Sequence, residues 1–461
     1  VAIGDPYDFE TMDTLPHVFN QELELVCASQ EQLQIALQEY YNAPTKEAME
    51  LEGDLVLGGG VDTEGLEAGE EEAPIIKLVS NMLAEAAKTR ASDIHIEPLE
   101  KCVRIRFRID GALHVVEEHP RKLLAPIVSR LKIMTGTMSI AEKRIPQDGR
   151  IQVKLGSKPI DLRVSTVVSN HGESIVMRIL DKTALLLGLG QLGFFSDQQE
   201  TFENLVALPD GIILVTGPTG SGKTTTLYAC LNYVNKPDKK IITVEDPVEY
   251  QLSGINQVQV KEKIGMTFAA ALRAMLRQAP NIIMLGEIRD EETATIAMNA
   301  SLTGHLVFST LHTNDAPGAV ARLSDMGIKP FLTASAVRAI EAQRLVRKVC
   351  EKCKQPAELS EKEMRMLNLD AAQMADSNVV KGRGCDQCKL TGHKGRQGIY
   401  EIFVIDDEVR HMINENLTTP ELRRRAREMG MRTLREDGIR KVLAGITSAT
   451  EVIRATMSDN D

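Results

Sequence analysis

The chain has 461 residues, which is enough for two to four domains with hydrophobic cores of their own. Its net charge is −11, tryptophan is absent and only 4% of the residues are aromatic, so little is available for stacking on nucleic-acid bases. No apolar run approaches the roughly 18 residues of a transmembrane helix, and the N-terminus lacks the basic and apolar layout of a secretory signal. We therefore expect a soluble cytoplasmic protein that does not bind nucleic acid.

Residues 1–72 hold most of the negative charge. They contain 18 Asp and Glu residues against one basic residue, Lys46, and so carry −17, which leaves +6 for the remainder. Residues 1–52 combine short apolar runs with a helix-like stretch at 29–41, which predicts a small acidic docking domain. Residues 53–72 are dominated by Gly and Glu, the composition of a flexible linker. Such an arm suits a basic protein partner, and the alternative is that it only keeps the chain in solution.

Residues 73–187 are predicted to form a second domain. An apolar-periodic stretch at 75–87 predicts a helix, and alternation at 102–109 predicts a strand that ends in a hairpin turn at Asp110-Gly111. More strands are expected, so the domain is of the α+β class, and their ranges are 150–154, 161–167 and 174–179. The Gly-rich residues 188–193 would form a hinge before the next domain.

Residues 217–224 match the phosphate-binding loop G-x-x-x-x-G-K-[ST] at every fixed position. The apolar run before them, 211–216, is typical of a buried parallel strand, and 224–231 can open a helix. In such a loop backbone N–H groups surround the phosphates, Lys223 reaches the β and γ phosphates and the Thr224 hydroxyl can ligate magnesium. The alternative is a Gly-rich turn without a ligand. The predicted nucleotide-binding residues here are Gly217, Pro218, Thr219, Gly220, Ser221, Gly222, Lys223, Thr224 and Thr225.

Three further apolar runs follow the loop, with helical segments between them, which predicts a mostly parallel α/β sheet; they are 241–244, 281–285 and 305–311. Nucleotide hydrolysis needs one carboxylate near the metal and another that positions water, both at strand ends facing the phosphate loop. Two acidic segments stand at such ends, 245–249 and 286–290, although an acidic residue after a strand is also a common helix N-cap. His305 and His312 flank the last run, where a histidine either contacts a γ-phosphate or is structural.

Four of the seven cysteines form two C-x2-C pairs, Cys350/Cys353 and Cys385/Cys388, with 31 residues between them. Four thiolates in two such pairs suit a tetrahedral structural zinc ion, and a redox pair is the alternative. The site would enclose an insertion over about residues 345–395, with helix formers from Ser360 to Ala375. Four protein ligands leave no open position, so we expect no catalysis at the metal.

Taken together, these motifs resemble the secretion ATPase superfamily. The phosphate loop is similar to its Walker A motif, and three later segments are similar to its Asp, Walker B and His boxes, namely 241–250, 285–290 and 303–313. Two more, 91–98 and 144–150, are similar to segments that precede the family's ATPase core. The resemblance covers about residues 73–461 and is greatest to type II secretion ATPases, with type IV pilus assembly ATPases next.

The resemblance implies a RecA-like core over residues 194–461 that works as a homo-hexamer, with ATP and Mg²⁺ bound between the second domain and the core. By matching positions, Glu245 would activate water and Glu287 would hold magnesium, while Gly286 replaces the Asp of many P-loop ATPases. His312 would belong to the catalytic set. Arginines for the γ-phosphate would come from Arg163 and Arg178, which the sequence alone places on solvated strands, and from Arg273 and Arg277.

The implied function is to power pseudopilus assembly for type II protein secretion across the outer membrane, or alternatively type IV pilus assembly. The protein would sit on the cytoplasmic face of the inner membrane, with residues 1–72 bound to the cytoplasmic domain of a secretion platform protein. A nucleic-acid motor is a rival that DNA-stimulated hydrolysis would reveal. A nucleotide sensor without hydrolysis is another, which the pair of Glu245 and Glu287 disfavours.

Overall fold

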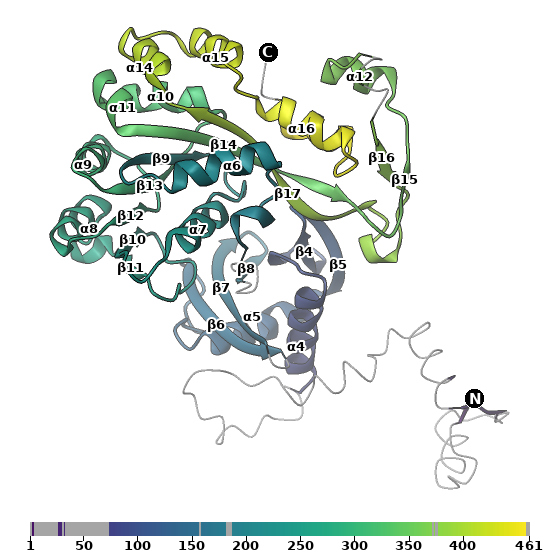
Figure 1. The fold of residues 1–461 in the computed structure, drawn as a ribbon. Coiled ribbons are helices and arrows are strands. Elements are labelled where there is room, and N and C mark those ends of the chain that lie inside the picture. The colour runs from purple at the N-terminus through teal and green to yellow at the C-terminus, as the bar shows by residue number, and fades with distance from the viewer. Residues whose placement is uncertain are drawn as a thin grey trace. The chain divides into compact units, whose positions relative to one another are not determined.

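The computed structural model describes residues 2–3, 26–29, 32, 73–155, 158–180, 187–370, 373 and 377–457 (Figure 1). The chain divides into two compact units, Val1–Asp181 and Lys182–Asp461. Most of the predicted acidic domain and all of the predicted linker lie outside the described residues, except for two short parallel strands, β1 (Ala2–Ile3) and β2 (Val26–Cys27). Among the described helices none combines the length and apolar character needed to cross a membrane.

An antiparallel sheet of six strands, in the order β5-β4-β3-β8-β7-β6, forms the first unit. The strands are β3 (Asp93–Pro98), β4 (Cys102–Ile109), β5 (Ala112–Pro120), β6 (Gln147–Leu155), β7 (Lys158–Ser169) and β8 (Gly172–Leu180). Two helices pack with the sheet in one core, α4 (Ala73–Lys88) and α5 (Leu124–Thr135). This arrangement matches the predicted α+β class.

Strand β4 shows why the sheet has one apolar and one polar face. Its Val103, Ile105 and Phe107 are buried in the core, and the arginines between them point to the opposite face. At the end of β4, Asp110 and Gly111 have φ angles of 48° and 86°. A two-residue turn with both φ values positive matches the right-handed twist of the strands, so the predicted hairpin is confirmed.

The second unit contains a seven-stranded sheet in the order β11-β10-β12-β13-β9-β14-β17, parallel throughout except for β17. Its strands are β9 (Gly211–Thr216), β10 (Ile241–Glu245), β11 (Asn256–Gln259), β12 (Ile282–Leu285), β13 (Leu306–Leu311), β14 (Val337–Val349) and β17 (His393–Val404). The four apolar runs in the sequence correspond to β9, β10, β12 and β13. The predicted, mostly parallel α/β sheet is therefore confirmed.

Helices cover both faces of this sheet (Figure 1). In β9, Ile212 and Leu214 pack into one core, while Ile213 and Val215 pack into the other with α6 and α7. A strand buried on both faces needs a continuous apolar run, which explains why residues 211–216 show no alternation. The helices are α6 (Ser196–Val206), α7 (Lys223–Val234), α8 (Phe268–Met275), α9 (Glu291–Leu302), α10 (Ala316–Asp325), α11 (Pro330–Ala336), α14 (Asp407–Asn414), α15 (Thr419–Glu428), α16 (Leu434–Leu443) and α17 (Ala449–Ala455).

Between β14 and β17 the chain makes the predicted excursion with the four cysteines. Strands β15 (Lys354–Pro356) and β16 (Val380–Gly382) pair in antiparallel fashion, and helix α12 (Glu361–Leu367) lies between them in sequence. Ser360 caps α12, because its Oγ accepts the backbone N–H of Glu363 at 3.3 Å. The helix-forming stretch is thus confirmed as far as Leu367, and residues 371, 372, 374 and 375 of the stretch lie outside the described part of the chain.

The predicted hinge at 188–193 packs against the second unit. Leu189 and Leu192 are buried in its core, and the Tyr400 hydroxyl donates to the carbonyl oxygen of Leu192 at 2.8 Å. The division between the two units falls earlier, after Asp181. A pivot at 188–193 stays a prediction.

Candidate nucleotide-binding site

The phosphate loop joins β9 to α7, as the sequence predicts. Gly217 and Gly222 have φ angles of 146° and 96°, and a Cβ on Gly217 would lie 2.5 Å from the carbonyl oxygen of Gln343. Side chains larger than hydrogen are therefore excluded at Gly217. Pro218, Thr219 and Gly220 form the exposed crest of the loop, so their backbone is accessible to a phosphate.

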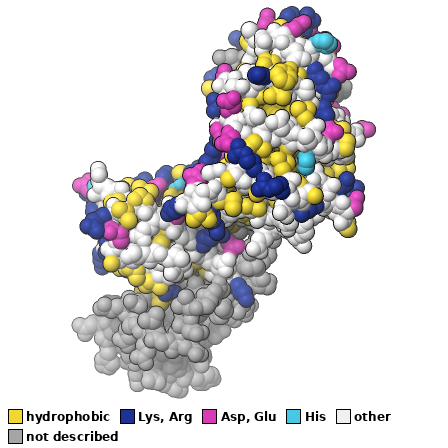
Figure 2. Space-filling view, turned by 90° about the vertical axis from the view of Figure 1, so that its left-hand side faces the viewer, with side chains coloured by type: hydrophobic (Ala, Val, Ile, Leu, Met, Phe, Trp, Pro, Cys, Tyr) yellow, Lys and Arg dark blue, Asp and Glu magenta, His cyan; other side chains and the backbone are white. Residues whose placement is uncertain are grey.

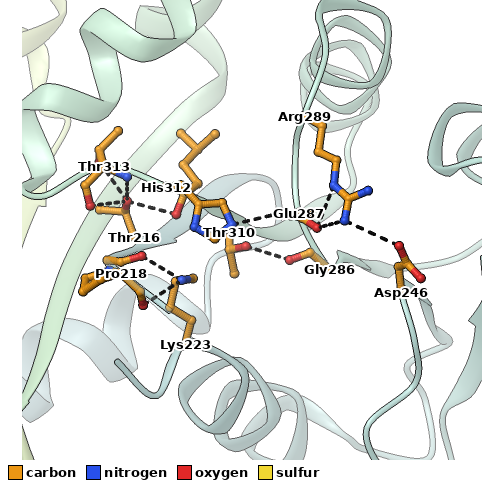
Figure 3. A network of polar contacts seen from close by, with 12 residues as sticks. Thr216, Pro218, Lys223, Asp246, Gly286, Glu287, Arg289, Thr310, His312 and Thr313 are labelled. Carbon is orange, nitrogen blue, oxygen red and sulfur yellow. Dashed lines mark hydrogen bonds and ion pairs between the residues drawn. The ribbon is translucent and has the colours of Figure 1, made fainter. Parts of the chain in front are cut away.

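Lys223, the first residue of α7, folds back over this loop (Figure 3). Its ammonium group donates to the carbonyl oxygens of Gly217 at 2.7 Å and Pro218 at 3.2 Å. Burial lowers the pKa of Lys223, and the carboxylate of Glu287 acts in the opposite direction. The side chain is therefore a half-buried cation held next to the loop that would receive phosphate. Thr224 is exposed and Thr225 half-buried beside it.

Glu287 follows β12 and lies in a chain of charged groups (Figure 3). One carboxylate oxygen accepts from Nε of Arg289 at 2.8 Å and the other from Nε2 of His312 at 3.0 Å; Arg289 also reaches Asp246 at 3.4 Å. Burial acts to raise the pKa of Glu287, but the hydrogen bonds from Arg289 and His312 outweigh it and lower that pKa. Glu287 is therefore a stable carboxylate at neutral pH.

Glu245, the last residue of β10, is 4% exposed and so more deeply buried than Glu287. Three side chains donate to its carboxylate: the Tyr228 hydroxyl, Thr243 Oγ1 at 2.6 Å and Gln257 Nε2 at 3.1 Å. In the sheet β10 is separated from β9 by β12 and β13. Both predicted carboxylates thus stand at the same edge as the phosphate loop, the edge where ligands bind in open parallel sheets.

The two histidines that flank β13 lie at opposite edges of the sheet. His312 follows the strand and joins Glu287, whereas His305 precedes it, and its Nδ1 lies 2.9 Å from the carbonyl oxygen of Ala300. Because β13 is parallel to β9, the edge at His305 is the one where β9 begins, away from the phosphate loop. Of the two, His312 is the functional candidate and His305 a structural residue.

The four cysteines gather in one cluster, with their sulfur atoms within 4.8 Å of one another. Three of the sulfur pairs are separated by 3.9 Å (Cys350 and Cys385), 3.8 Å (Cys353 and Cys388) and 3.7 Å (Cys385 and Cys388). A tetrahedron with zinc–sulfur bonds of about 2.3 Å has sulfur atoms about 3.8 Å apart. The cluster therefore fits zinc in size and in ligand chemistry.

Backbone N–H groups support the same interpretation. Those of Cys385 and Gly392 donate to Cys388 Sγ at 3.1 and 3.3 Å. Burial acts to raise the pKa of Cys388, but these hydrogen bonds outweigh it and bring that pKa to about 7. Metal ligands must be deprotonated thiolates, which these donors favour at Cys388, whereas burial raises the pKa of Cys353 to about 11. The spacing of the four sulfur atoms therefore carries the zinc assignment.

Comparison with known proteins places this architecture in a family. A family model described as "Type II/IV secretion system protein" matches residues 68–454. The chain belongs to this family. It is 48% identical over 449 residues to the type II secretion system protein E of Pseudomonas aeruginosa, an alignment that covers 95% of this chain and 88% of the relative. It is 44% identical over 478 residues to the type IV pilus assembly ATPase PilB of Myxococcus xanthus, covering 100% of this chain and 82% of that one.

Among solved structures, the pilus retraction motor PilT, crystallised with ADP, is 26% identical with a TM-score of 0.56. The match covers 81% of this chain and 96% of PilT. The secretion-family chain therefore has an α/β ATPase fold, and its family membership supports an ATPase activity.

The arginines that the family resemblance implies lie on two separate units. Arg163 on β7 and Arg178 on β8 are directly opposite each other, in a register row across five strands that also contains Arg150, Asp93 and Arg108. Residues opposite one another share a face of the sheet, so this row places four arginines and one carboxylate on the same face. Asp93 accepts from Arg178 at 3.1 Å and from Arg108 at 3.3 Å. The action of Arg163 and Arg178 on a γ-phosphate stays a prediction.

Arg273 and Arg277 lie on α8 and the turn that follows it. Arg273 pairs with Glu292 on α9, and Arg277 donates to the carbonyl oxygen of Arg273 at 3.0 Å. These contacts hold both side chains on the helix surface. A role for them toward a nucleotide also stays a prediction.

Sequence reasoning missed several residues that hold the site together. Gln343 on β14, 1% exposed, donates to the carbonyl oxygen of Ser221 and accepts from Thr226, each at 2.7 Å. Arg289 lies within the segment 285–290, and its positive charge two residues from Glu287 could have predicted the contact between them. The contacts of Gln343 could not be predicted, because no motif near it in the sequence connects β14 with the phosphate loop.

Proposed function

We propose that the protein is a motor ATPase that hydrolyses ATP to ADP and phosphate and thereby powers pseudopilus assembly for type II protein secretion. One observation carries the proposal: four neighbouring strands end in the groups that hydrolysis needs. Glu245 ends β10, Glu287 follows β12, His312 follows β13 and the phosphate loop follows β9, in the sheet order β10-β12-β13-β9. The relatives named above connect such a site to secretion and pilus assembly.

Each group has a part in this reaction. The loop N–H groups and Lys223 take the β and γ phosphates, and Glu245 accepts the proton of the attacking water. The Thr224 hydroxyl and Glu287 would hold Mg²⁺, which when bound supplies positive charge against the phosphate oxygens. His312 keeps Glu287 oriented through the bond between them. Phosphoryl transfer depends on positioning and electrostatics, which these side chains provide without a covalent step.

We infer that the second unit is a RecA-like core and that the active form is a homo-hexamer. In it ATP would bind between the first unit and the core, with Arg163 and Arg178 as cations for the developing charge and Arg273 and Arg277 as further candidates. Hydrolysis would then drive movement of one unit against the other about residues 188–193. The size of the tetracysteine cluster supports a structural zinc ion in the insertion.

The place of action that we propose is the cytoplasmic face of the inner membrane. The charge of −17 on residues 1–72 supports docking on a protein with a basic surface, the cytoplasmic domain of a secretion platform protein. On the face of the molecule in Figure 2, Lys and Arg side chains lie among acidic and apolar ones. That face therefore offers a protein partner charged and apolar contacts side by side.

Type IV pilus assembly is the second candidate, because the Myxococcus xanthus pilus ATPase aligns with the whole of this chain. Complementation separates the two. We expect the gene to restore export in a host strain that lacks its own type II secretion ATPase, and to leave piliation unrestored in a strain without its pilus assembly ATPase. The opposite outcome would assign pilus assembly, and DNA-stimulated hydrolysis at physiological salt would assign a nucleic-acid motor.

A further inference from the structure

The buried carboxylate of Glu245 accepts hydrogen bonds from three particular side chains. One of its oxygens accepts the Tyr228 hydroxyl, and the other accepts Thr243 and Gln257. Burial, followed by the charge of Glu245, raises the pKa of Tyr228 well above its ordinary value. The phenol is therefore a permanent donor at working pH, and Glu245 is its acceptor.

These donors come from three different elements, namely α7, β10 and the edge strand β11. Gln257 has its amide orientation fixed, because its Oε1 accepts the N–H of Leu252 at 2.7 Å and its Nε2 also donates to the carbonyl oxygen of Tyr250 at 2.8 Å. Its amide N–H is thereby aimed at Glu245. Three of about four acceptor positions on the carboxylate are occupied, which leaves about one for a water molecule.

Tyr228 ties this carboxylate to the phosphate-binding helix. It lies five residues after Lys223 on α7, about 7.5 Å further along the helix axis. The helix between and around them is rigidly packed, since Leu227, Ala229 and Leu231 are at most 2% exposed. One rigid helix, α7, therefore carries both Lys223, which would bind phosphate, and Tyr228, which donates a hydrogen bond to Glu245.

We propose that Tyr228 is a positioning residue for ATP hydrolysis. Its hydrogen bond sets Glu245 at a fixed distance from the phosphates that Lys223 binds. This inference rests on the proposed ATPase function and on Glu245 as the group that accepts the proton from water. A general base acts only within hydrogen-bond reach of that water, and a displacement of about 1 Å costs up to roughly 10²-fold in rate. The Tyr228 hydroxyl and Gln257 prevent such a displacement.

The test is a double-mutant cycle in the full chain. We expect Tyr228→Phe to lower kcat for Mg-ATP about tenfold and to leave KM and ATP affinity within about twofold. In the Glu245→Gln background the same change should have no further effect, because the group that it positions no longer acts as a base. If Tyr228 only fills the core, Tyr228→Phe would instead lower the stability of the protein, and its effect on kcat would multiply with that of Glu245→Gln.

Tyr233→Phe is the control. Tyr233 is a tyrosine of the same helix α7, 44% exposed, and lies outside the proposed site and the predicted hinge. The kcat of this variant should stay within about twofold of the wild type. Equal kcat values for Tyr228→Phe and Tyr233→Phe, or multiplicative losses in the cycle, would overturn the inference. If Tyr228→Phe does not fold, Gln257→Met enters the same cycle, with the same expected and contrary results.

The outcomes also separate this inference from the proposed function. A wild-type chain without Mg-ATP hydrolysis, even when assembled, would remove the ATPase proposal itself. Wild-type turnover with an unimpaired Glu245→Gln would leave the ATPase proposal and remove the base assignment together with the inference. Wild-type turnover, a slow Glu245→Gln and an unaffected Tyr228→Phe would remove the inference alone.

Discussion

Gln343 holds the phosphate loop through Ser221: its side-chain amide donates to the Ser221 carbonyl oxygen at 2.7 Å from a position that is 1% exposed. The same amide accepts from Thr226, one turn into α7. A single side chain on β14 thus fixes the loop and the start of its helix. The loop is consequently shaped before any phosphate arrives, and preorganisation of this kind reduces the cost of binding.

Gln343→Met should weaken nucleotide binding, because it keeps the volume of the side chain and removes both hydrogen bonds. The Ser221 carbonyl then lacks a buried donor, and we expect the affinity for a non-hydrolysable ATP analogue to fall roughly tenfold by titration calorimetry. Gln198→Met in α6 is the control, as it changes another buried glutamine of the same unit. An equal loss of affinity in both variants would contradict a specific role for Gln343.

Lys223 and Glu245 should affect the reaction separately, since one binds phosphate and the other positions water. Lys223→Ala is expected to weaken ATP binding and to abolish turnover. Glu245→Gln should bind ATP normally and hydrolyse it at least roughly 10²-fold more slowly, the usual cost of lost base catalysis. Binding and phosphate-release assays on the same preparations measure both effects. Normal turnover by Glu245→Gln would transfer the base role to Glu287.

Asp197 on α6 should make the stability of the second unit dependent on acidic pH. Burial acts to raise its pKa, but hydrogen bonds from Arg440 and Arg432 outweigh it and bring the pKa to about 2. A carboxyl with a lowered folded-state pKa stabilises the fold above its unfolded value of about 3.9, and loses this contribution as the pH falls toward about 2. The effect is small because the side chain is 43% exposed and the ion pairs are screened.

We therefore expect Asp197→Asn to have a lower midpoint of thermal unfolding than the wild type at pH 7, with a gap that narrows below about pH 3.9. Glu200→Gln, on the exposed side of the same helix, should show no gap at either pH. If the difference in unfolding midpoint between Asp197→Asn and the wild type grew as the pH fell, the result would contradict a stabilising ion pair at Asp197. Calorimetric scans from pH 7 to pH 3 provide the measurement.

Local signals in the sequence were sufficient for most of the fold. The alternation at 102–109 and the apolar run at 211–216 identified β4 and β9 because burial alone dictates these patterns. Strand β14 could not be predicted in this way. Its buried Glu341 and Gln343 interrupt the apolar pattern, and Gln343 is accommodated only by hydrogen bonds to Ser221 and Thr226, more than 100 residues away in the chain.

The sequence predicted residues of the candidate site and not the contacts between them. Fixed motif spacing predicted Lys223, and position after a strand predicted two acidic segments, in which the family resemblance selected Glu245 and Glu287. The hydrogen bond between Tyr228 and Glu245 depends on how α7 packs on β10, a tertiary relationship that no spacing in the sequence records. The position of Arg163 and Arg178 relative to the nucleotide depends in the same way on how two separate units come together.

Zinc should act in folding and not in catalysis, since four cysteine ligands leave no open coordination position. Cys388→Ser and Cys350→Ser are expected to lose stoichiometric zinc by elemental analysis and to loosen residues 350–388 in limited proteolysis. Cys102→Ser, in the first unit, should retain the metal. Wild-type protein without stoichiometric zinc, after purification in metal-free buffer, would contradict the assignment.

Residues 1–72 should be the membrane docking arm. Their charge of −17 favours a basic or mixed protein surface, and the Gly and Glu composition of residues 53–72 would let the arm stay bound while the ATPase moves. Because the phosphate loop, Glu245 and Glu287 all lie in the second unit, removal of residues 1–72 should leave nucleotide binding intact and release the protein from membranes. Fractionation of cell extracts, beside an ATP-binding assay on the same truncated chain, measures both. If the truncated chain still sediments with membranes as fully as the intact one, docking lies elsewhere, and the polar face of the six-stranded sheet becomes the next surface to test.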